Sequence, residues 1–176
     1  LWAKYYGAKQ IIGISRGDYR LDMGRAIGMD DLIDTRDVVK EDHANTVAAE
    51  KVLELTNGEG ADLIFECSGS NILQPQTILS AAKSAKIIIL GNPTHSLKLD
   101  RDIYSMVLRK ELTIKGSWSS CVTPKNEWRE VLDLIKKGDI DPSIIITHTF
   151  ELDQIKSVME DMYFKKFNYS KVAFKL

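Results

Sequence analysis

Short runs of apolar residues alternate along the chain with longer segments in which apolar residues recur every three or four positions. The runs are apolar on both faces, as parallel strands are when helices cover the sheet on both sides. They predict strands over residues 9–15, 62–67, 86–90 and 111–115, with a shorter one over 31–34. The longer segments predict helices over residues 1–6, 19–27, 45–56 and 72–83. This alternation is typical of a doubly wound α/β sheet.

Glycine and capping residues set the expected ends of these helices. Gly7 is expected just past the first helix, because only glycine takes the left-handed conformation without steric cost. Asp18 is expected to cap the helix over 19–27, which Gly28 ends. Asn57 and Gly58 are expected to stop the helix over 45–56.

The tail after Trp118 changes character. Thr123 as N-cap and Pro124 at the first helical position predict a helix that runs through residue 137, where Gly138 closes it. The pattern then predicts a strand over residues 144–150, a helix over 152–164 and a last strand over 171–174.

Composition narrows the function classes. The 176 residues are 44% hydrophobic and 28% charged, values near the average for folded domains. The 24 Lys and Arg balance 25 Asp and Glu without a block of like charge, which argues against a nucleic-acid or membrane surface. No apolar run approaches the roughly 20 residues that span a bilayer. We therefore expect a cytoplasmic enzyme.

The residues that bind metals or form disulfides are scattered. Cys67 and Cys121 lie far apart and neither belongs to a CxxC pair. His43, His95 and His148 show no spacing that puts two ligands on one helical face, so each is expected to be a surface or packing residue. The sequence predicts no metal ligand and no catalytic residue in this chain.

The ends of the predicted strands are the expected ligand site, because ligands of an open parallel sheet bind beyond the carboxyl ends of its strands. Residues 15–17, 67–70, 91–93 and 116–119 occupy these ends, and each segment contains Gly, Ser or Asn. Such residues let the backbone approach a ligand closely. No GxGxxG motif lies between a first strand and a first helix. Residues 58–60 read GEG but follow a helix and precede a strand, so they are interpreted as a helix-terminating turn.

The first of these strand ends bears on cofactor choice. A carboxylate there would accept hydrogen bonds from the adenosine ribose and repel a 2′-phosphate, whereas this chain has Ser15 and Arg16. Arg16 offers a planar fork for phosphate oxygens, and Arg20 in the first helical turn can point to the same place. These residues favour NADP over NAD.

The motifs in this order resemble the C-terminal half of a zinc-dependent medium-chain alcohol dehydrogenase over essentially all of the chain. The stretch from Trp2, WAKYYGAKQIIGISRGDYRLDMGRAIGMD, resembles the family's helix, strand and helix after the glycine turn. NGEGADLIFECSGS, KIIILGNP and LRKELTIKGSW resemble later landmarks. The last of these, with NEWREVLDLIKKGDI and ITHTF, is most similar to the polyol and polyol-phosphate branch, such as galactitol-1-phosphate 5-dehydrogenase and sorbitol dehydrogenase.

The resemblance implies roles at matching positions. Ser15 stands where NAD-dependent members commonly carry Asp. The other implied cofactor contacts are, in chain order, Cys67, Ser68 and Gly69 beside the adenosine and ribose, Gly91, Asn92, Ser117, Trp118 and Ser119 at the nicotinamide, and Lys171 near the pyrophosphate. The implied reaction is hydride transfer between the nicotinamide and a zinc-bound alcohol, with zinc as Lewis acid. The zinc ligands and the proton relay belong to an N-terminal catalytic domain.

The resemblance also implies a division and an incompleteness. Residues 1–118 correspond to a dinucleotide-binding domain, and residues 119–176 to the return of the chain to the catalytic domain. The sheet is expected to lack its first strand and glycine turn, leaving a groove of unpaired backbone between residues 11–14 and 63–65. An isolated chain is then poorly stable or borrows a strand. Residues 112–115 resemble an element that extends the sheet across a dimer, so a homodimer is expected.

Other readings stay open at this point. A zinc-independent quinone-reductase-like member has the same domain. A methyltransferase also has a doubly wound sheet, although it usually places an acidic residue where Ser15 and Arg16 stand. A fragment that only binds nucleotide or dimerises is the non-enzymatic alternative.

Overall fold

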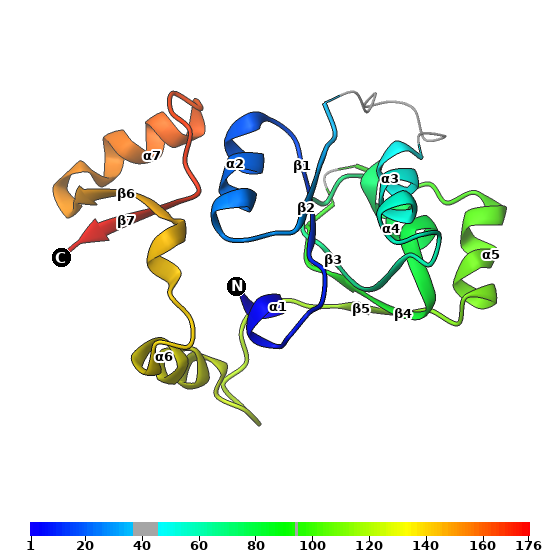
Figure 1. The fold of residues 1–176 in the computed structure, drawn as a ribbon. Coiled ribbons are helices and arrows are strands. Elements are labelled where there is room, and N and C mark those ends of the chain that lie inside the picture. The colour runs from blue at the N-terminus through cyan, green and yellow to red at the C-terminus, as the bar shows by residue number, and fades with distance from the viewer. Residues whose placement is uncertain (37–45, 94) are drawn as a thin grey trace. The chain divides into compact units, whose positions relative to one another are not determined.

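The computed structural model describes residues 1–36, 46–93 and 95–176, and the chain divides into two compact units (Figure 1). One unit consists of Leu1–Leu32 together with Cys121–Leu176, and the other is Ile33–Ser120. The predicted helix start at Asn45 and the histidine at position 43 lie outside the described residues. In the part of the chain that is described, no helix is long and apolar enough to cross a membrane.

The unit of residues 33–120 is built on a three-stranded parallel sheet with the order β3-β4-β5. Its strands and helices are α3 (Val47–Leu55), β3 (Ala61–Glu66), α4 (Leu73–Ser80), β4 (Ala81–Ile89), α5 (Arg101–Arg109) and β5 (Thr113–Gly116). Helix α4 contacts β3, β4 and both neighbouring helices, α3 and α5. The α/β class with parallel strands is confirmed.

The core of this unit lies between its helices and one face of the sheet. Ile87 of β4 is 0% exposed and packs with Ile78 and a cluster of buried alanines. Alternate residues of β3 behave differently, because successive side chains of a strand point to opposite faces. Ile64 packs against the core, whereas Leu63 is 50% exposed and Phe65 is 55% exposed. One face of β3 is therefore covered and the other faces solvent within this unit.

The other unit combines elements from both ends of the chain. They are α1 (Trp2–Tyr5), β1 (Ile12–Ser15), α2 (Asp18–Ala26), β2 (Asp31–Asp34, which crosses the unit boundary), α6 (Glu127–Lys137), the short 3-10 helices η1 (Pro142–Ile145) and η2 (Leu152–Gln154), β6 (Ile146–Glu151), α7 (Ile155–Tyr163) and β7 (Lys171–Lys175). Strands β1 and β2 form one small sheet, and β6 and β7 form another, which is parallel.

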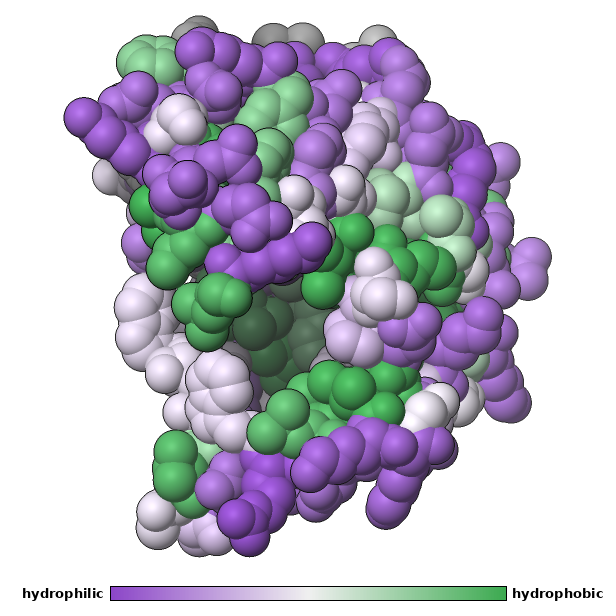
Figure 2. Space-filling model, turned by 90° about the vertical axis from the view of Figure 1, so that its left-hand side faces the viewer, coloured by the Kyte–Doolittle hydropathy of each residue, from purple (hydrophilic) through white to green (hydrophobic). Residues whose placement is uncertain are grey.

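Figure 2 shows green, hydrophobic side chains around a hollow in the molecular surface.

Several predicted boundaries are confirmed by backbone conformation. Gly7, Gly28 and Gly138 follow α1, α2 and α6 with positive φ angles. Asn57 and Gly58 follow α3 in the same region of φ, so the GEG segment is a helix-terminating turn as predicted. His95 is exposed, and His148 packs on Phe150, which agrees with surface and packing roles.

The helix predicted over residues 72–83 is too long. Helix α4 ends at Ser80, and residues 81–83 belong to β4, where Ala81 is extended with a ψ of 140°. The cause lies far along the chain. Lys110 Nζ donates to the carbonyl oxygens of Ile78, Leu79 and Ala81 at 3.2, 2.8 and 2.7 Å, and so satisfies carbonyl groups at the end of the helix.

Helix α5 was not predicted from the pattern. Its sequence carries the signal, because Ile103, Met106 and Val107 follow the spacing of one helical face and all three pack against the core. The long stretch between the strands predicted over 86–90 and 111–115 therefore contains the crossover helix that a parallel pair requires.

The predicted first residues of two helices and one strand are also wrong. Gly17 is the N-cap of α2, at a φ of 94° that favours glycine, and Asp18 is the first helical residue. Helix α6 begins at Glu127 rather than after Thr123, because Asn126 Oδ1 accepts a hydrogen bond from the Arg129 N–H at 3.0 Å. The strand predicted over 144–150 begins at Ile146, since η1 occupies the preceding residues.

Candidate functional site

The carboxyl ends of β3, β4 and β5 meet at one edge of their sheet. Register places Glu66 opposite Ile89 and Ile89 opposite Gly116, so the three chains leave the sheet at the same level. The Ser117 N–H then donates to the Ile89 carbonyl oxygen at 2.9 Å, which holds the residue after β5 against β4. The structure thus brings together three of the strand ends that the sequence singled out.

Glycine lets the loops after β3 and β4 pack directly on each other. A β-carbon at Gly91 would collide with the backbone of Gly69, and one at Gly69 would collide with the backbone of Asn92. Gly69 also has a φ of 67°, in the region that side chains rarely adopt. Cys67, Ser68, Gly69, Gly91 and Asn92, which were separate candidates in the sequence, therefore form one cluster of loop backbone.

A buried carboxylate that sequence reasoning missed lies beneath this cluster. Glu66, the last residue of β3, is only 4% exposed. Its Oε1 accepts hydrogen bonds from the Ser68 N–H at 2.8 Å, the Ser68 hydroxyl at 2.5 Å and the Gly69 N–H at 3.1 Å. Gln74 Nε2, from α4, donates to Oε2 at 3.2 Å. The sequence does contain a signal for Glu66: it is a glutamate at the end of an apolar strand, directly before Cys67, Ser68 and Gly69.

Cys67 stands at the exposed side of the same strand end. The surrounding chain partly shields its sulfur from water, and the negative charge of Glu66 acts in the same direction, so the pKa of the Cys67 thiol is raised above its ordinary value. Both effects disfavour the thiolate. Cys67 is therefore a poor nucleophile, which fits a residue beside a ligand better than a reactive one.

Trp118 and Ser119 continue from Ser117 but leave the strand-end edge. Trp118 is 82% exposed, and Ser119 has a positive φ of 65°. The hydrogen bonds described for this unit do not join either residue to the loops after β3 and β4. The structure thus groups Ser117 with the other strand ends and leaves its two successors outside the group.

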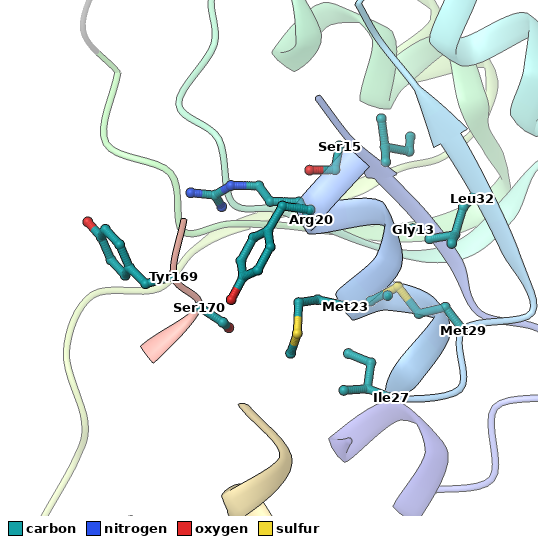
Figure 3. A pocket seen from close by; sticks show the side chains of 12 residues that line it. Gly13, Ser15, Arg20, Met23, Ile27, Met29, Leu32, Tyr169 and Ser170 are labelled. Carbon is teal, nitrogen blue, oxygen red and sulfur yellow. The ribbon is translucent and has the colours of Figure 1, made fainter. Parts of the chain in front are cut away.

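The end of β1 opens on a pocket of about 240 Å³ in the other unit (Figure 3). Ser15 and Arg20 lie on its wall, and Tyr169 and Ser170 reach it from the segment before β7. The remaining lining is mostly apolar and comes from β1, α2 and the following turn and strand, through Gly13, Ile14, Tyr19, Met23, Gly24, Ile27, Met29 and Leu32. An apolar wall with a cationic and hydroxyl rim suits a ligand that has both a flat ring and an anionic group.

The other two residues of this unit that the sequence predicted as cofactor contacts do not line the pocket. Arg16 is exposed and follows Ser15, and Lys171 is exposed and follows Ser170. Arg16 and Arg20 place two cations near the first turn of α2, where the helix dipole also favours an anion. Asp18 brings one carboxylate into the same turn. The net charge around the pocket rim therefore favours an anionic ligand.

A metal centre does not fit the part of the chain that the structure describes. No three His, Cys, Asp or Glu side chains come together there in a way that could hold a metal ion. Zinc chemistry consequently has no ligand set among these residues.

A family model described as zinc-binding dehydrogenase matches residues 1–137. The chain belongs to the zinc-binding dehydrogenase family. An L-threonine 3-dehydrogenase from Bacillus licheniformis is 34% identical over 163 residues, covering 91% of this chain and 43% of that protein. The predicted resemblance to medium-chain dehydrogenases is confirmed.

Solved structures agree on the fold. Galactitol-1-phosphate dehydrogenase from Escherichia coli has a TM-score of 0.79 at 21% identity, covering 97% of this chain and 47% of that one. A short chain alcohol dehydrogenase from E. coli, complexed with the cofactor NADH, has a TM-score of 0.77 at 24% identity, with 97% and 46% covered. The chain spans less than half the length of these relatives.

Proposed function

We propose that this chain is the cofactor-binding part of an NAD(P)-dependent alcohol dehydrogenase. The observation that carries the proposal is the strand-end edge of β3, β4 and β5, where the buried glycines Gly69 and Gly91 let the loops after β3 and β4 pack backbone against backbone. Ligands of open parallel sheets bind at this edge. Membership of the zinc-binding dehydrogenase family supports a dinucleotide as the ligand.

The residues have distinct proposed roles. When bound, NAD(P) supplies the nicotinamide ring that accepts or donates the hydride. The family resemblance supports residues 91–92 and 117–119 as the segments that orient that ring, of which Trp118 and Ser119 leave the strand-end edge in this structure, and residues 67–69 as the neighbours of the adenosine and its ribose. The family resemblance supports Lys171 as a proposed cation for the pyrophosphate. None of these residues transfers a proton or binds a metal, so the chemical step needs zinc ligands and a proton relay from outside the described residues.

The end of β1 supports NADP as the preferred cofactor. Ser15 carries no charge to repel a 2′-phosphate, and the guanidinium groups of Arg16 and Arg20 can form charge-assisted hydrogen bonds with its oxygens. The NADH-bound relative shows that the alternative cofactor occurs on a similar fold. NADP is thus proposed from the charges of this chain.

The proposed substrate is a secondary alcohol, either a polyol or a sugar-alcohol phosphate, in keeping with the tail sequence. Threonine is a second candidate, because a relative 34% identical is an L-threonine 3-dehydrogenase. Both candidates present a CH–OH group, from which hydride and proton leave to give a ketone. Turnover of galactitol 1-phosphate, sorbitol and threonine, measured side by side on the complete gene product, separates them.

We also propose a domain division, an oligomeric state and a location for the protein. Residues 1–118 form the dinucleotide-binding domain, and residues 119–176 return to a catalytic domain. The exposed edge strand β5 favours a homodimer, since an unpaired edge invites pairing. A cytoplasmic location is consistent with the free Cys67 and Cys121.

Substitution of Ser15 by Asp tests the cofactor assignment. The added carboxylate lies where the 2′-phosphate is proposed to bind, and like-charge juxtaposition costs several kcal/mol, so the Kd for NADPH should rise about 100-fold while the Kd for NADH changes little. Both constants are measured by fluorescence titration of the complete gene product. Ser157→Asp adds the same charge at an exposed position of α7, outside the proposed cofactor contacts, and should leave both values unchanged.

The outcomes separate the two parts of the proposal. A wild-type protein that binds neither dinucleotide contradicts the proposed function. If Ser15→Asp binds NADPH as tightly as the wild type does, the dinucleotide function stands and the phosphate assignment is wrong.

A further inference from the structure

The loops after β3 and β4 are held by the same residue. The backbone carbonyl oxygen of Glu66 accepts hydrogen bonds from the N–H groups of Leu90 at 2.8 Å and Gly91 at 2.9 Å, which fixes the loop after β4. The carboxylate of Glu66 accepts from Ser68 and Gly69, which fixes the loop after β3. One residue therefore sets the spacing between two segments that are far apart in the sequence.

Packing makes this spacing tight. A β-carbon at Gly91 would lie 2.6 Å from Glu66 Oε2, so the carboxylate already fills the space beneath that loop. Gly69 and Asn92 touch through backbone above it. A change at the carboxylate is thus transmitted to both loops, because close-packed groups have no room to absorb it.

The partners of the carboxylate are all donors. Ser68, Gly69 and Gln74 donate N–H or O–H groups to it, and no described lysine, arginine or histidine forms an ion pair with it. A glutamine in its place would turn one acceptor oxygen into an NH₂ group. That NH₂ group cannot accept from Gly69 or Gln74, and the loss of the negative charge weakens the hydrogen bonds that the remaining oxygen accepts.

We propose that Glu66 is a positioning residue, which holds the two loops at the separation that the dinucleotide requires. It is buried beneath the loops and acts through Ser68, Gly69 and Gly91 rather than by contact with the ligand. The role rests on the proposed function, since it concerns how the same edge binds NAD(P).

The main test is Glu66→Gln in the complete gene product, with two readouts. Amide hydrogen exchange at Ser68 and Gly69 should become about tenfold faster, because their shared acceptor is weakened, while exchange within β4 stays as in the wild type. The Kd for NADPH, measured by fluorescence titration, should rise about tenfold. Exchange needs no ligand, so it reports on the loops whether or not the cofactor binds.

Two further variants separate positioning from loss of stability. Gln74→Leu removes the α4 donor but keeps the hydrogen bonds from Ser68 and Gly69, so it should lower stability without weakening NADPH binding. Gly91→Ala leaves the Glu66 side chain in place, but its β-carbon would collide with the backbone nitrogen of Gly69 and lie 2.6 Å from Glu66 Oε2, so it pushes the two loops apart and should weaken NADPH binding.

The results decide the proposal. Unchanged exchange at Ser68 and Gly69 in Glu66→Gln overturns the positioning role, and so does faster exchange with an unchanged Kd. A Gln74→Leu protein that loses binding to the same extent reduces Glu66 to a stability residue. A wild-type protein that binds neither NADH nor NADPH sinks the proposed function, and the exchange data then show whether Glu66 still joins the loops.

Discussion

Cys67 shows how burial and a neighbouring charge act on one thiol. Partial burial of the sulfur raises the pKa of the Cys67 thiol, and the negative charge of the adjacent, buried Glu66 adds to this effect. The thiol is nevertheless at the exposed side of the strand end. It is therefore accessible to a reagent but held mainly in its unreactive form at neutral pH.

Alkylation of Cys67 should follow this electrostatic effect. In a Cys121→Ser background, the reaction with iodoacetamide is expected to be slow near neutral pH and to accelerate as pH rises through the raised pKa of the thiol. Glu66→Gln removes the negative charge, lowers that pKa and shifts the whole rate profile to lower pH. Mass spectrometry of labelled peptides over a pH series measures both profiles, and coincident profiles would rule out the influence of Glu66.

Some residues of the candidate site could be predicted from the sequence, and others could not. The residue types at strand ends, such as Ser68 and Gly91, point to loops near a ligand, because small residues permit close backbone approach. Glu66 could not be assigned in this way. Its importance depends on which donors the fold places around it, and donors from α4 and from the following loop are not visible in a linear pattern.

At the scale of elements, the junction between α4 and β4 is set by a distant lysine. Lys110 follows α5 and its ammonium group donates to the carbonyl oxygens of Ile78, Leu79 and Ala81. Its own carbonyl oxygen accepts from the Ser84 N–H at 2.6 Å. Local propensity favours a longer helix there, whereas these contacts end it, and this tertiary effect is the reason why the sequence-based boundary failed.

Replacement of Lys110 by Met should destabilise the protein. The buried carbonyl groups lose their donor, which costs about 1–3 kcal/mol of unfolding free energy. Urea unfolding of the complete gene product, followed by circular dichroism, gives the value. Lys83→Met is the matched control at an exposed position of β4 and should change the free energy by less than about 0.5 kcal/mol. Equal effects of the two substitutions would remove the proposed role of Lys110.

For the whole molecule, the open side of β3 is the dominant feature. In the described residues, β3 is the outer strand of the β3-β4-β5 sheet, while β1 pairs with β2 in a separate sheet. Leu63 and Phe65 expose apolar area on this strand. The resemblance to medium-chain dehydrogenases implied that residues 11–14 and 63–65 would not pair directly with each other.

The 176-residue chain by itself should therefore self-associate. An unpaired apolar strand offers backbone donors and acceptors to another copy, so the mass found by analytical ultracentrifugation should exceed 19.9 kDa and increase with concentration. Phe65→Lys should bring the mass back toward that of one chain, whereas Leu108→Lys, at an exposed site of α5, should not. A wild-type chain that stays monomeric and unfolds cooperatively like an ordinary domain would contradict this expectation.

The contact between Gly69 and Gly91 has a practical consequence for anyone who wishes to redesign cofactor choice. No side chain can be introduced at either position without pushing the two loops apart. The end of β1 has no such restriction, because Arg16 and Arg20 are exposed there. Libraries aimed at a new cofactor preference should therefore vary Ser15, Arg16 and Arg20, and keep Gly17 and the two loop glycines fixed.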